Sequence, residues 1–385
     1  MHILLTGGGS GGHITPLLAV AHELKSKHPE CKLSYIGEKD GSFGRLVVES
    51  GLFAHVDYVR AGKFRRYHDE SLLRRIFDVK TNALNVRDAF YVLIGCFQAF
   101  VSLRRRAPDA IFAKGGFVVV PVGVAARLRR IPFMTHDSDA VPGLANRIIG
   151  RWAAHHATGL PVSFYDYPEE KTSFVGVPGA ADFKKATPAM VKRARKAMGI
   201  PENAEVVLVT GGSQGSQRIN SAVKAIARQL LGERENVWVV HHLGSRNHAL
   251  YGDFTHERLI TATFFDNFAE VAAAADVIIT RAGANSMTEF GLLEKATVVI
   301  PSPFLANGHQ LKNARQLAET DAIVELDEPE ITRSPEVLLK VTRRLLDDKN
   351  ERRRLASNLR KATKADAAAA IARLVYQLGK KSHEA

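Results

Sequence analysis

The sequence predicts an α/β protein built from two doubly wound parallel-sheet domains of the Rossmann type. Short apolar runs alternate with amphipathic segments through most of the 385 residues, glycine-rich turns follow several runs, and the alternation stops once and then restarts. Alternating strands and helices favour a parallel sheet covered by helices on both faces. A chain of this length is also long enough for two domains of ordinary size.

The first half of the chain opens on a strand and then repeats the strand–helix pattern. The expected strands are 2–7, 32–37, 55–60, 110–116 and 132–137. Residues 17–27 have the apolar spacing of an amphipathic helix. A stretch rich in Pro, Gly and short polar residues, 157–183, then interrupts the pattern. We therefore expect an N-terminal domain over 1–162, with the boundary near Pro161–Phe164.

The pattern restarts in the second half, where we expect a C-terminal domain over 163–365. Its apolar runs lie within 205–216, 236–244, 259–265, 276–284, 296–303 and 321–328. The closing stretch, from Pro335 to Lys380, is predicted to be helical. Ligands bind doubly wound sheets outside the carboxyl ends of the strands, so we expect the site in a cleft between the two domains.

Composition and charge limit the class of function. The two cysteines, Cys31 and Cys96, lack disulfide-framework or metal-ligand spacing, which favours a reducing cytoplasm. We expect no secretory leader and no membrane span, because the longest apolar stretch, 89–103, is short for a span. A net charge of +13 fits either a solvated basic surface or anionic partners. Nucleic acid is not an expected partner, because no nucleic-acid-binding module is recognised.

The first glycine-rich turn allows two interpretations. Gly7, Gly9 and Gly12 spell G-x-G-x-x-G between the first strand and the first helix. With Glu38 as a ribose-binding acid, this pattern is typical of an NAD-dependent oxidoreductase. A glycine turn at a helix N-terminus also binds other phosphates. His13 is unusual for the NAD hypothesis, because it places a titratable ring at the start of the helix.

Polar side chains follow successive strands of the second domain. They are Ser213 and Gln214 in the turn 211–216, then Arg281, Ser286 and Glu289, and finally the adjacent pair His309 and Gln310. Hydroxyl, amide and guanidinium groups can bind a diphosphate, and Glu289 can accept hydrogen bonds from ribose hydroxyls. Each turn alone could be a simple helix cap. Together they indicate a nucleotide diphosphate site in the second domain.

These segments resemble, in order and spacing, the motifs of the MurG family. The matching segments are GGGSGGHITPLLAVA, KGGFVVVPVGVAA, GGSQGSQRIN, RAGANSMTE and HQLKNA. The resemblance spans nearly the whole chain and implies the two-domain GT-B fold, with a final helix of about 366–385 packed back on the first domain. It also implies an inverting hexosyltransferase of peptidoglycan synthesis. Such an enzyme moves N-acetylglucosamine from UDP-N-acetylglucosamine to undecaprenyl-pyrophosphoryl-muramoyl-pentapeptide, without a cofactor.

The resemblance also implies roles for individual residues. The donor-site matches are Ser213, Phe265, Ala284, Asn285, Ser286, Met287, Thr288, Glu289 and Gln310, with Gln214, Arg281 and His309 beside them. Phe265 matches a uracil contact, Ser286 a diphosphate-binding hydroxyl and Glu289 the ribose-binding acid. Gln310 matches a residue that reads the sugar. The matches to a loop that faces the acceptor diphosphate are Ser10, Gly11, Gly12 and His13.

The chain departs from the family pattern where the acceptor is expected. Asp139 stands where the family has Asn, Val177–Ala180 lacks a family Arg, and Phe117 replaces Tyr. These departures support a second hypothesis, in which a related GT-B enzyme uses another acceptor as a glycolipid synthase, or acts as a nucleotide-sugar epimerase. Asp137 to Asp139 also spell D-x-D, which can bind Mg²⁺ or Mn²⁺. A turn or helix cap is the favoured interpretation, and no metal is expected.

Two side chains are candidates for the general base that deprotonates the acceptor. His13 has an ordinary pKa near neutrality and lies on the first glycine loop. Asp139 is the alternative. Both are also expected to contact the acceptor.

A basic and apolar patch is expected to hold the protein on the cytoplasmic face of the membrane as a peripheral protein. It comprises Lys63, Arg65, Arg66, Leu72, Leu73, Arg74, Arg75, Ile76 and Phe77. Each basic side chain near an anionic lipid surface contributes about 1 kcal/mol. Most of the apolar stretch 89–103 is expected to pack inward as core.

Overall fold

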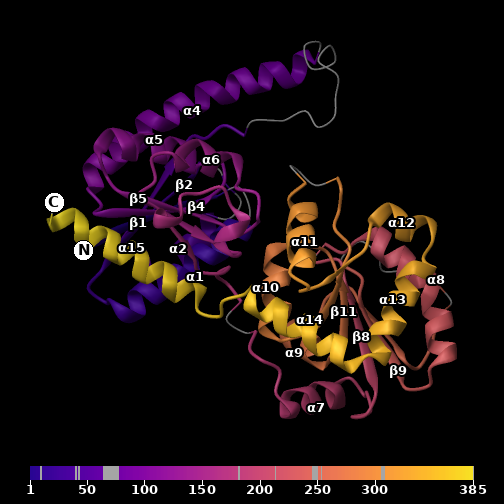
Figure 1. The fold of residues 1–385 in the computed structure, drawn as a ribbon. Coiled ribbons are helices and arrows are strands. Elements are labelled where there is room, and N and C mark those ends of the chain that lie inside the picture. The colour runs from indigo at the N-terminus through magenta and orange to yellow at the C-terminus, as the bar shows by residue number, and fades with distance from the viewer. Residues whose placement is uncertain are drawn as a thin grey trace. The chain divides into compact units, whose positions relative to one another are not determined.

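The chain forms two compact units, described separately here (Figure 1). The computed structural model describes residues 1–8, 11–39, 41, 44–63, 78–180, 183–212, 214–244, 250–252, 254–304 and 308–384. Unit 1 comprises Met1–Gly179 and Asp366–Ala385, and unit 2 comprises Ala180–Ala365. Unit 2 is therefore inserted in the chain between the main part of unit 1 and its last helix.

Unit 1 contains a seven-stranded parallel sheet in the order β3-β2-β1-β4-β5-β6-β7. The strands are β1 (His2–Gly7), β2 (Lys32–Glu38), β3 (His55–Val59), β4 (Ala110–Gly115), β5 (Phe133–Asp137), β6 (His155–Thr158) and β7 (Thr172–Phe174). The helices before the insertion are α1 (Gly11–Lys27), α2 (Gly44–Glu49), α4 (Val79–Arg106), α5 (Val119–Arg129) and α6 (Leu144–Gly150). The strand order reverses at β1 and β4, so the loops after these strands lie at a topological switch point.

The central strands of unit 1 are buried on both faces, which explains their nearly continuous apolar sequence. In β1, Ile3 and Leu5 pack with α1, whereas Leu4 packs with α4 and α5 on the opposite face. Successive side chains of a strand point to opposite faces, so one short run supplies both cores.

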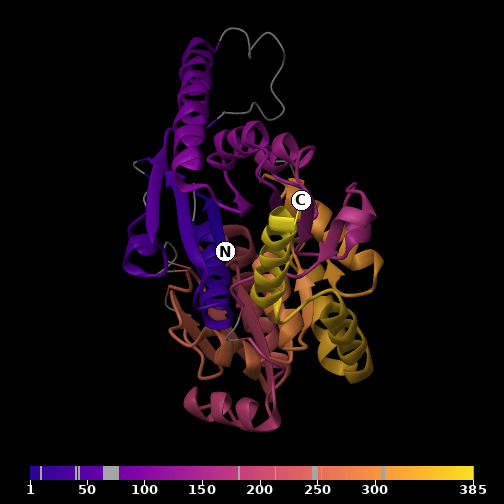
Figure 2. The ribbon, with the colours of Figure 1, turned by 90° about the vertical axis from the view of Figure 1, so that its left-hand side faces the viewer.

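The last helix, α15 (Ala367–Glu384), completes the core of unit 1 (Figure 2). Ile371 and Val375 are fully buried in the cluster that contains the apolar face of α1. The ring of Tyr376 stacks on His28 of the segment after α1, with ring centroids 3.7 Å apart. Burial of the two aliphatic side chains alone contributes about 3–5 kcal/mol. The helix is thus an integral layer of this unit.

Unit 2 contains a six-stranded parallel sheet in the order β10-β9-β8-β11-β12-β13. The strands are β8 (Glu205–Thr210), β9 (Val237–His242), β10 (Leu259–Ala262), β11 (Val277–Thr280), β12 (Ala296–Val299) and β13 (Val324–Glu325). The helices are α7 (Pro188–Ala197), α8 (Gln217–Glu233), α9 (Phe268–Ala274), α10 (Ala284–Leu292), α11 (His309–Glu319), α12 (Glu328–Arg333), α13 (Glu336–Asp347) and α14 (Lys349–Lys361). Its main core packs β8, β9, β11 and β12 against α8 and α13.

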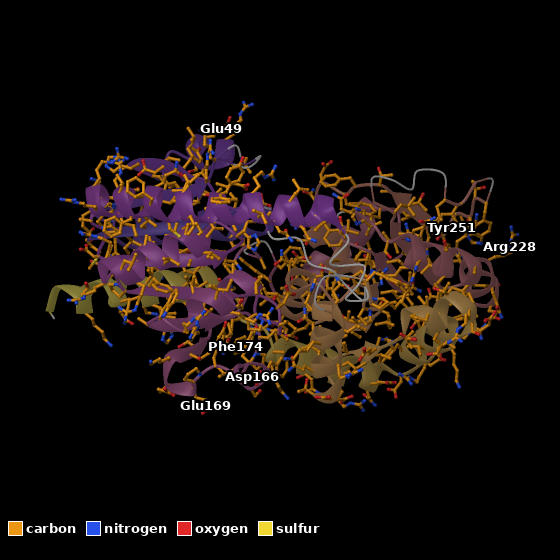
Figure 3. The ribbon with its side chains drawn as sticks, turned by 90° about the horizontal axis from the view of Figure 1, so that it is seen from above. Glu49, Asp166, Glu169, Phe174, Arg228 and Tyr251 are labelled. Carbon is orange, nitrogen blue, oxygen red and sulfur yellow. The ribbon has the colours of Figure 1, made fainter. Side chains whose placement is uncertain are left out.

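The predicted fold class of two doubly wound parallel sheets is confirmed, and every predicted strand segment contains a strand. The first sheet, however, continues through β6 and β7, and the predicted interruption contains the whole of β7 (Phe174 is labelled in Figure 3). The compact units therefore divide after Gly179 instead of near Pro161–Phe164. Both missed strands are short and polar, so their pairing depends on neighbouring strands and not on an apolar pattern.

Candidate functional sites

The first site lies at the carboxyl ends of β1, β4 and β5 in unit 1. Gly8 donates its N–H to the carbonyl of Gly115, at 3.3 Å, which joins the loops after β1 and β4. Gly116 has a φ of +83°, and a Cβ there would lie 2.1 Å from the Gly8 carbonyl oxygen. Only glycine permits this approach. Packing between the two loops therefore explains part of the glycine pattern in the sequence.

His13, in the first turn of α1, lies beside these glycines. A Cβ at Gly115 would be 3.4 Å from the Nε2 atom of His13. Burial, and next the charge of Lys114, lower the pKa of His13 to about 4, against a hydrogen bond to the Gly8 carbonyl and the charge of Asp139. The expectation that this pKa stays near neutrality is therefore wrong. The ring is neutral at pH 7, and the nitrogen that does not donate to Gly8 can accept a proton.

A buried lysine in β4, Lys114, also belongs to this site and was not predicted from the sequence. Lys114, in β4, is 3% exposed and donates from Nζ to the Oγ of Ser138 at 2.8 Å and to the Nδ1 of His136 at 2.9 Å. The Nε2–H of His136 donates to the Gly176 carbonyl at 2.8 Å. Burial lowers the pKa of Lys114 to about 8, so it carries its charge at pH 7. The available sequence signal was a charged residue inside an otherwise apolar strand.

Asp137 holds the turn after β5. Its Oδ1 accepts hydrogen bonds from Asn146 Nδ2 at 2.9 Å and Gly143 N at 3.1 Å, and its Oδ2 accepts from the Tyr167 hydroxyl at 2.9 Å. Burial raises the pKa of Asp137, and these three donors oppose the rise. Asp139, two residues on, is half-buried. The hydrogen bonds of Asp137 support the turn interpretation of the D-x-D motif.

The second site lies at the carboxyl ends of β8, β9 and β11 in unit 2. The N–H of Gly212 donates to Thr210 Oγ1 at 3.2 Å, and this hydroxyl donates to Nδ1 of His242 at 3.0 Å. The Nε2–H of His242 donates to the Thr263 carbonyl at 3.1 Å. This chain of hydrogen bonds joins the glycine turn to the segment that carries Phe265, whose ring centroid is 6.0 Å from that of His242. His242 was not among the site residues predicted from the sequence.

A second buried histidine, His241, holds the loop after β9 through Asn220. His241 donates from Nε2 to Asn220 Oδ1 at 3.0 Å and accepts at Nδ1 from the Tyr251 hydroxyl at 2.8 Å (Tyr251 is labelled in Figure 3). Asn220 in turn donates to the carbonyl of Leu243, at 2.9 Å. The adjacent pair of histidines thus serves two different hydrogen-bond networks on opposite faces of β9.

The N-terminus of α10 presents free backbone donors in this site. Its N-cap is Gly283, which has no side chain to accept from them, and the first helical hydrogen bond is from Met287 N to the Gly283 carbonyl. The N–H groups of residues 284–286 therefore have no partner within the helix. Asn285 is exposed and Ser286 half-buried. Such a terminus favours anions.

The other predicted residues of α10 divide between site and core. Met287 and Thr288 are each 1% exposed, and Ala284 is also buried, so their side chains belong to the interior of unit 2. Glu289 is half-buried, and burial raises the pKa of its carboxyl group to about 7. A half-buried carboxyl group at this position can accept hydrogen bonds from a ligand's hydroxyl groups.

Arg281 stabilises the loops of the second site. Its guanidinium pairs with Glu328, which is 1% exposed and also pairs with Arg218, and it donates to the Oγ of Ser216 at 2.6 Å. Ser216 is the N-cap of α8, so Arg281 joins the turns before α8 and α10. The sequence also predicts that Arg281 contacts a diphosphate directly, and that contact stays a prediction.

The remaining predicted donor residues lie around these loops. Gln310, in the first turn of α11, is buried and accepts at Oε1 from the N–H of Ser302 at 3.0 Å. Its neighbour His309 is half-buried, and Gln214 is exposed. Ser10 and Ser213 lie outside the described residues, as do all the predicted patch residues except Lys63.

Helix α4 exposes an apolar stripe, contrary to the expectation that residues 89–103 pack mostly inward. Val86, Phe90, Leu93, Ile94, Phe97 and Val101 share one face and are 41–70% exposed. The opposite side packs Ala99 and Leu103 in the core of unit 1. Within the described chain, the segment Thr81–Arg106 alone is long and apolar enough to span a membrane by length and composition. No metal-binding group of three or more His, Cys, Asp or Glu side chains occurs among the described residues.

Comparisons with known proteins place these sites in context. The N-terminal domain of glycosyltransferase family 28 matches residues 3–158, and its C-terminal domain matches residues 206–372. A UDP-N-acetylglucosamine–N-acetylmuramyl-(pentapeptide) pyrophosphoryl-undecaprenol N-acetylglucosamine transferase from Salinibacter ruber is 34% identical over 98% of this chain and 96% of its own length. The Clostridium perfringens protein of the same name is 34% identical, over 92% of both chains.

Two solved structures share the fold. The crystal structure of MurG from Acinetobacter baumannii superposes with a TM-score of 0.73, at 24% identity, and covers 98% of this chain and 99% of its own. The calicheamicin glycosyltransferase CalG4 superposes with a TM-score of 0.68, at 16% identity, over 98% of each chain.

Proposed function

The chain belongs to the MurG family of UDP-N-acetylglucosamine–N-acetylmuramyl-(pentapeptide) pyrophosphoryl-undecaprenol N-acetylglucosamine transferases, and on this premise we propose that unit 2 binds the sugar donor and unit 1 the acceptor. The enzyme transfers N-acetylglucosamine from UDP-N-acetylglucosamine to the muramoyl-pentapeptide carried by undecaprenyl pyrophosphate, a step of peptidoglycan synthesis. The assignment of each site to one substrate is our inference from the geometry.

The donor assignment rests on two features of α10: the free N–H groups at its N-terminus, and the half-buried acid Glu289 one turn along. A diphosphate accepts hydrogen bonds from the helix N-terminus and is stabilised by its partial positive charge. Glu289, one turn further along, is spaced to accept from ribose hydroxyls. Phe265 offers an aromatic face for the uracil ring, and His242 and Thr263 hold the segment that carries it. As the diphosphate gains charge during transfer, the same donors stabilise it.

The acceptor assignment rests on the loops around His13. The acceptor hydroxyl attacks the anomeric carbon of the sugar as UDP leaves, which inverts that carbon and gives a β-linked product. The hydroxyl proton passes to a base, and neutral His13 has one ring nitrogen available to take it. Asp139 lies close enough to influence the charge of His13 and is the alternative base. With a pKa of about 4, His13 is a weaker base than an imidazole with a pKa near 7. Asp139 therefore stays the alternative base.

A transfer assay tests the function and the two candidate bases. Purified protein, UDP-N-acetylglucosamine and a short-chain lipid acceptor should yield the disaccharide lipid and UDP in equal amounts. At saturating donor, we expect His13→Asn to lower kcat about 10²–10⁴-fold, with a smaller loss for Asp139→Asn. The reverse order would assign the base to Asp139. Turnover with another lipid acceptor, or epimerisation of the nucleotide sugar, with none on the muramoyl lipid would contradict the main proposal.

We also propose that the exposed stripe of α4 holds the enzyme on a membrane surface as a peripheral protein. Six large apolar side chains on one helix face are costly in water and suit insertion into the boundary of headgroups and acyl chains. Arg104, exposed in the last turn of α4, suits contact with anionic lipid, whereas Arg105 and Arg106 pair with Asp57. Because Ala99 and Leu103 pack into the core of unit 1, the helix favours lying on the bilayer over crossing it.

Co-sedimentation with vesicles of anionic lipid tests this surface. The double substitution Phe90→Ser and Phe97→Ser should reduce the bound fraction at least about tenfold, because two aromatic side chains no longer insert. Val48→Ser removes an exposed apolar side chain on α2 instead and should leave binding unchanged. Equal vesicle binding by all three proteins would contradict the proposal.

A further inference from the structure

Lys114 is a buried cation whose hydrogen-bond partners do not neutralise it. Its hydrogen-bond partners among the described residues, Ser138 and His136, are both uncharged acceptors. His136 must accept at Nδ1, because its Nε2 donates to the Gly176 carbonyl. Among the described residues, no carboxylate forms an ion pair with Lys114, and Asp137 and Asp139 act on it only at longer range. A buried charge in this state exerts a strong field on its surroundings.

The charge of Lys114 acts on His13, in the first turn of α1. Lys114 and Gly115 are consecutive residues of β4, and a Cβ at Gly115 would lie 3.3 Å from the Cδ2 atom of the His13 ring. Among the described residues, the groups that act on this ring are the Gly8 carbonyl, Lys114 and Asp139. Only two of these groups carry charge, and they oppose one another. The effect of Lys114 on the ring exceeds that of Asp139.

We propose that Lys114 is a positioning residue for the transfer reaction, which holds the His136–Ser138 turn and, together with burial, disfavours the protonated form of His13. The inference rests on the proposed role of His13 and adds a residue that acts through it. A positive charge next to the imidazole makes imidazolium less stable, so the ring stays unprotonated in mildly acid solution. The hydrogen bonds from Lys114 to His136 and Ser138 also hold the segment that leads to Asp139.

The test removes the charge with and without the hydrogen bond. Lys114→Met removes both, whereas Lys114→Gln keeps an amide donor for His136. Lys295→Met is the matched control, because Lys295 is half-buried, has a pKa lowered by burial to about 8, and donates to two carbonyl groups of unit 2. The readout is the titration of His13, followed by NMR of protein with isotope-labelled imidazoles. The spectrum of His13→Asn identifies the signal among the fifteen histidines.

Both Lys114 variants should raise the midpoint of the His13 titration by about one pH unit, because a like charge has been removed. Lys295→Met should leave it unchanged. Burial still acts on the ring, so the midpoint should stay below the ordinary value of 6.5. A midpoint unchanged in both Lys114 variants would overturn the proposal. Lys114→Gln keeps a donor in place, so the test remains available if Lys114→Met fails to fold.

The pH profile of kcat separates this inference from the assignment of His13 as base. If His13 is the base, the acid limb of kcat should move to higher pH in the Lys114 variants, in step with the NMR midpoint. A purely structural role for Lys114 would lower kcat at every pH and leave the limb in place. If the NMR midpoint moves and the limb of kcat does not, the effect of Lys114 on His13 stands, and the base role of His13 is wrong instead.

Discussion

Replacement of Glu289 by Gln is the sharpest test of the donor site. Burial raises the pKa of the Glu289 carboxyl to about 7, from an ordinary 4.5, and no second influence acts on it. With this pKa, about a tenth of the sites are ionised at pH 6 and about nine tenths at pH 8. If only the carboxylate accepts the ribose hydroxyls, the Kd for UDP-N-acetylglucosamine should rise about tenfold from pH 8 to pH 6. This corresponds to about 1.4 kcal/mol.

Isothermal titration calorimetry measures this dependence directly. The donor is a diphosphate diester that does not titrate in this range, so the change reports on the protein. At pH 7, binding should release about half a proton per site, measured from the heats in two buffers of different ionisation enthalpy. Glu289→Gln should bind more weakly at pH 8, with a flat pH profile and no proton release. Glu294→Gln changes an acid just beyond α10 and should keep the native profile. A flat profile in the native protein, or the native slope in Glu289→Gln, would refute the argument.

The raised pKa of Glu289 also affects stability. The folded carboxyl keeps its proton up to about pH 7, whereas the unfolded carboxyl loses it near pH 4.5. The folded state therefore binds more protons in this window, and the free energy of unfolding falls as pH rises through it. Glu289→Gln cannot lose a proton. Without ligand above pH 7, urea denaturation should show this variant to be more stable than the native protein by about 2 kcal/mol, after allowance for partial solvent access.

Two substitutions, each with a control, and one deletion test the framework around the sites. Gly116→Ala places a Cβ against the Gly8 carbonyl at positive φ, and should lower the free energy of unfolding, measured in urea, by about 2–4 kcal/mol. The control Gly179→Ala has a φ of +112° but open space around the Cβ, and should lower it by about 1–2 kcal/mol. Glu328→Gln leaves Arg218 and Arg281 without their buried carboxylate and should destabilise unit 2 by about 3 kcal/mol, while the exposed Glu330→Gln should be neutral. Deletion of residues 366–385 uncovers the α1 face of unit 1 and should lower the melting temperature of that unit while leaving UDP binding by unit 2 intact. A single shared transition with both properties lost would contradict the last expectation.

The fold was predictable because its strongest signals are local. Strands such as β1 and β8 are continuous apolar runs, and each is followed by a glycine turn and a helix. These patterns determine the class of sheet and the edge at which ligands bind. β6 and β7 carry no such pattern, since His155–Thr158 and Thr172–Phe174 are short and polar and are stabilised by pairing with strands already in place. The extent of the first sheet therefore could not be inferred from the sequence.

The site was predictable in its residue types but less so in its contacts. The helical phase of α10 sends Met287 and Thr288 into the core, although a motif match treats them like their neighbours. The partner of Arg281 is Glu328 in α12, two strands further along the chain, and the partners of Lys114 are His136 in β5 and Ser138 just after it. Such contacts depend on how the strands align, which no local pattern specifies. The pKa of His13 is lowered first by burial among these loops and next by the charge of Lys114, so an ordinary value was the wrong expectation.

The insertion of unit 2 within unit 1 has a consequence for synthesis on the ribosome. The strands of unit 1 emerge first, but α15 emerges only after the whole of residues 180–365. At about 5–20 residues per second, this delay is on the order of 10–40 s. During that time the apolar face of α1 that Ile371 and Val375 will cover stays open to solvent and to chaperones. The core of unit 1, whose strands are translated before unit 2, can therefore close only after unit 2 has been translated.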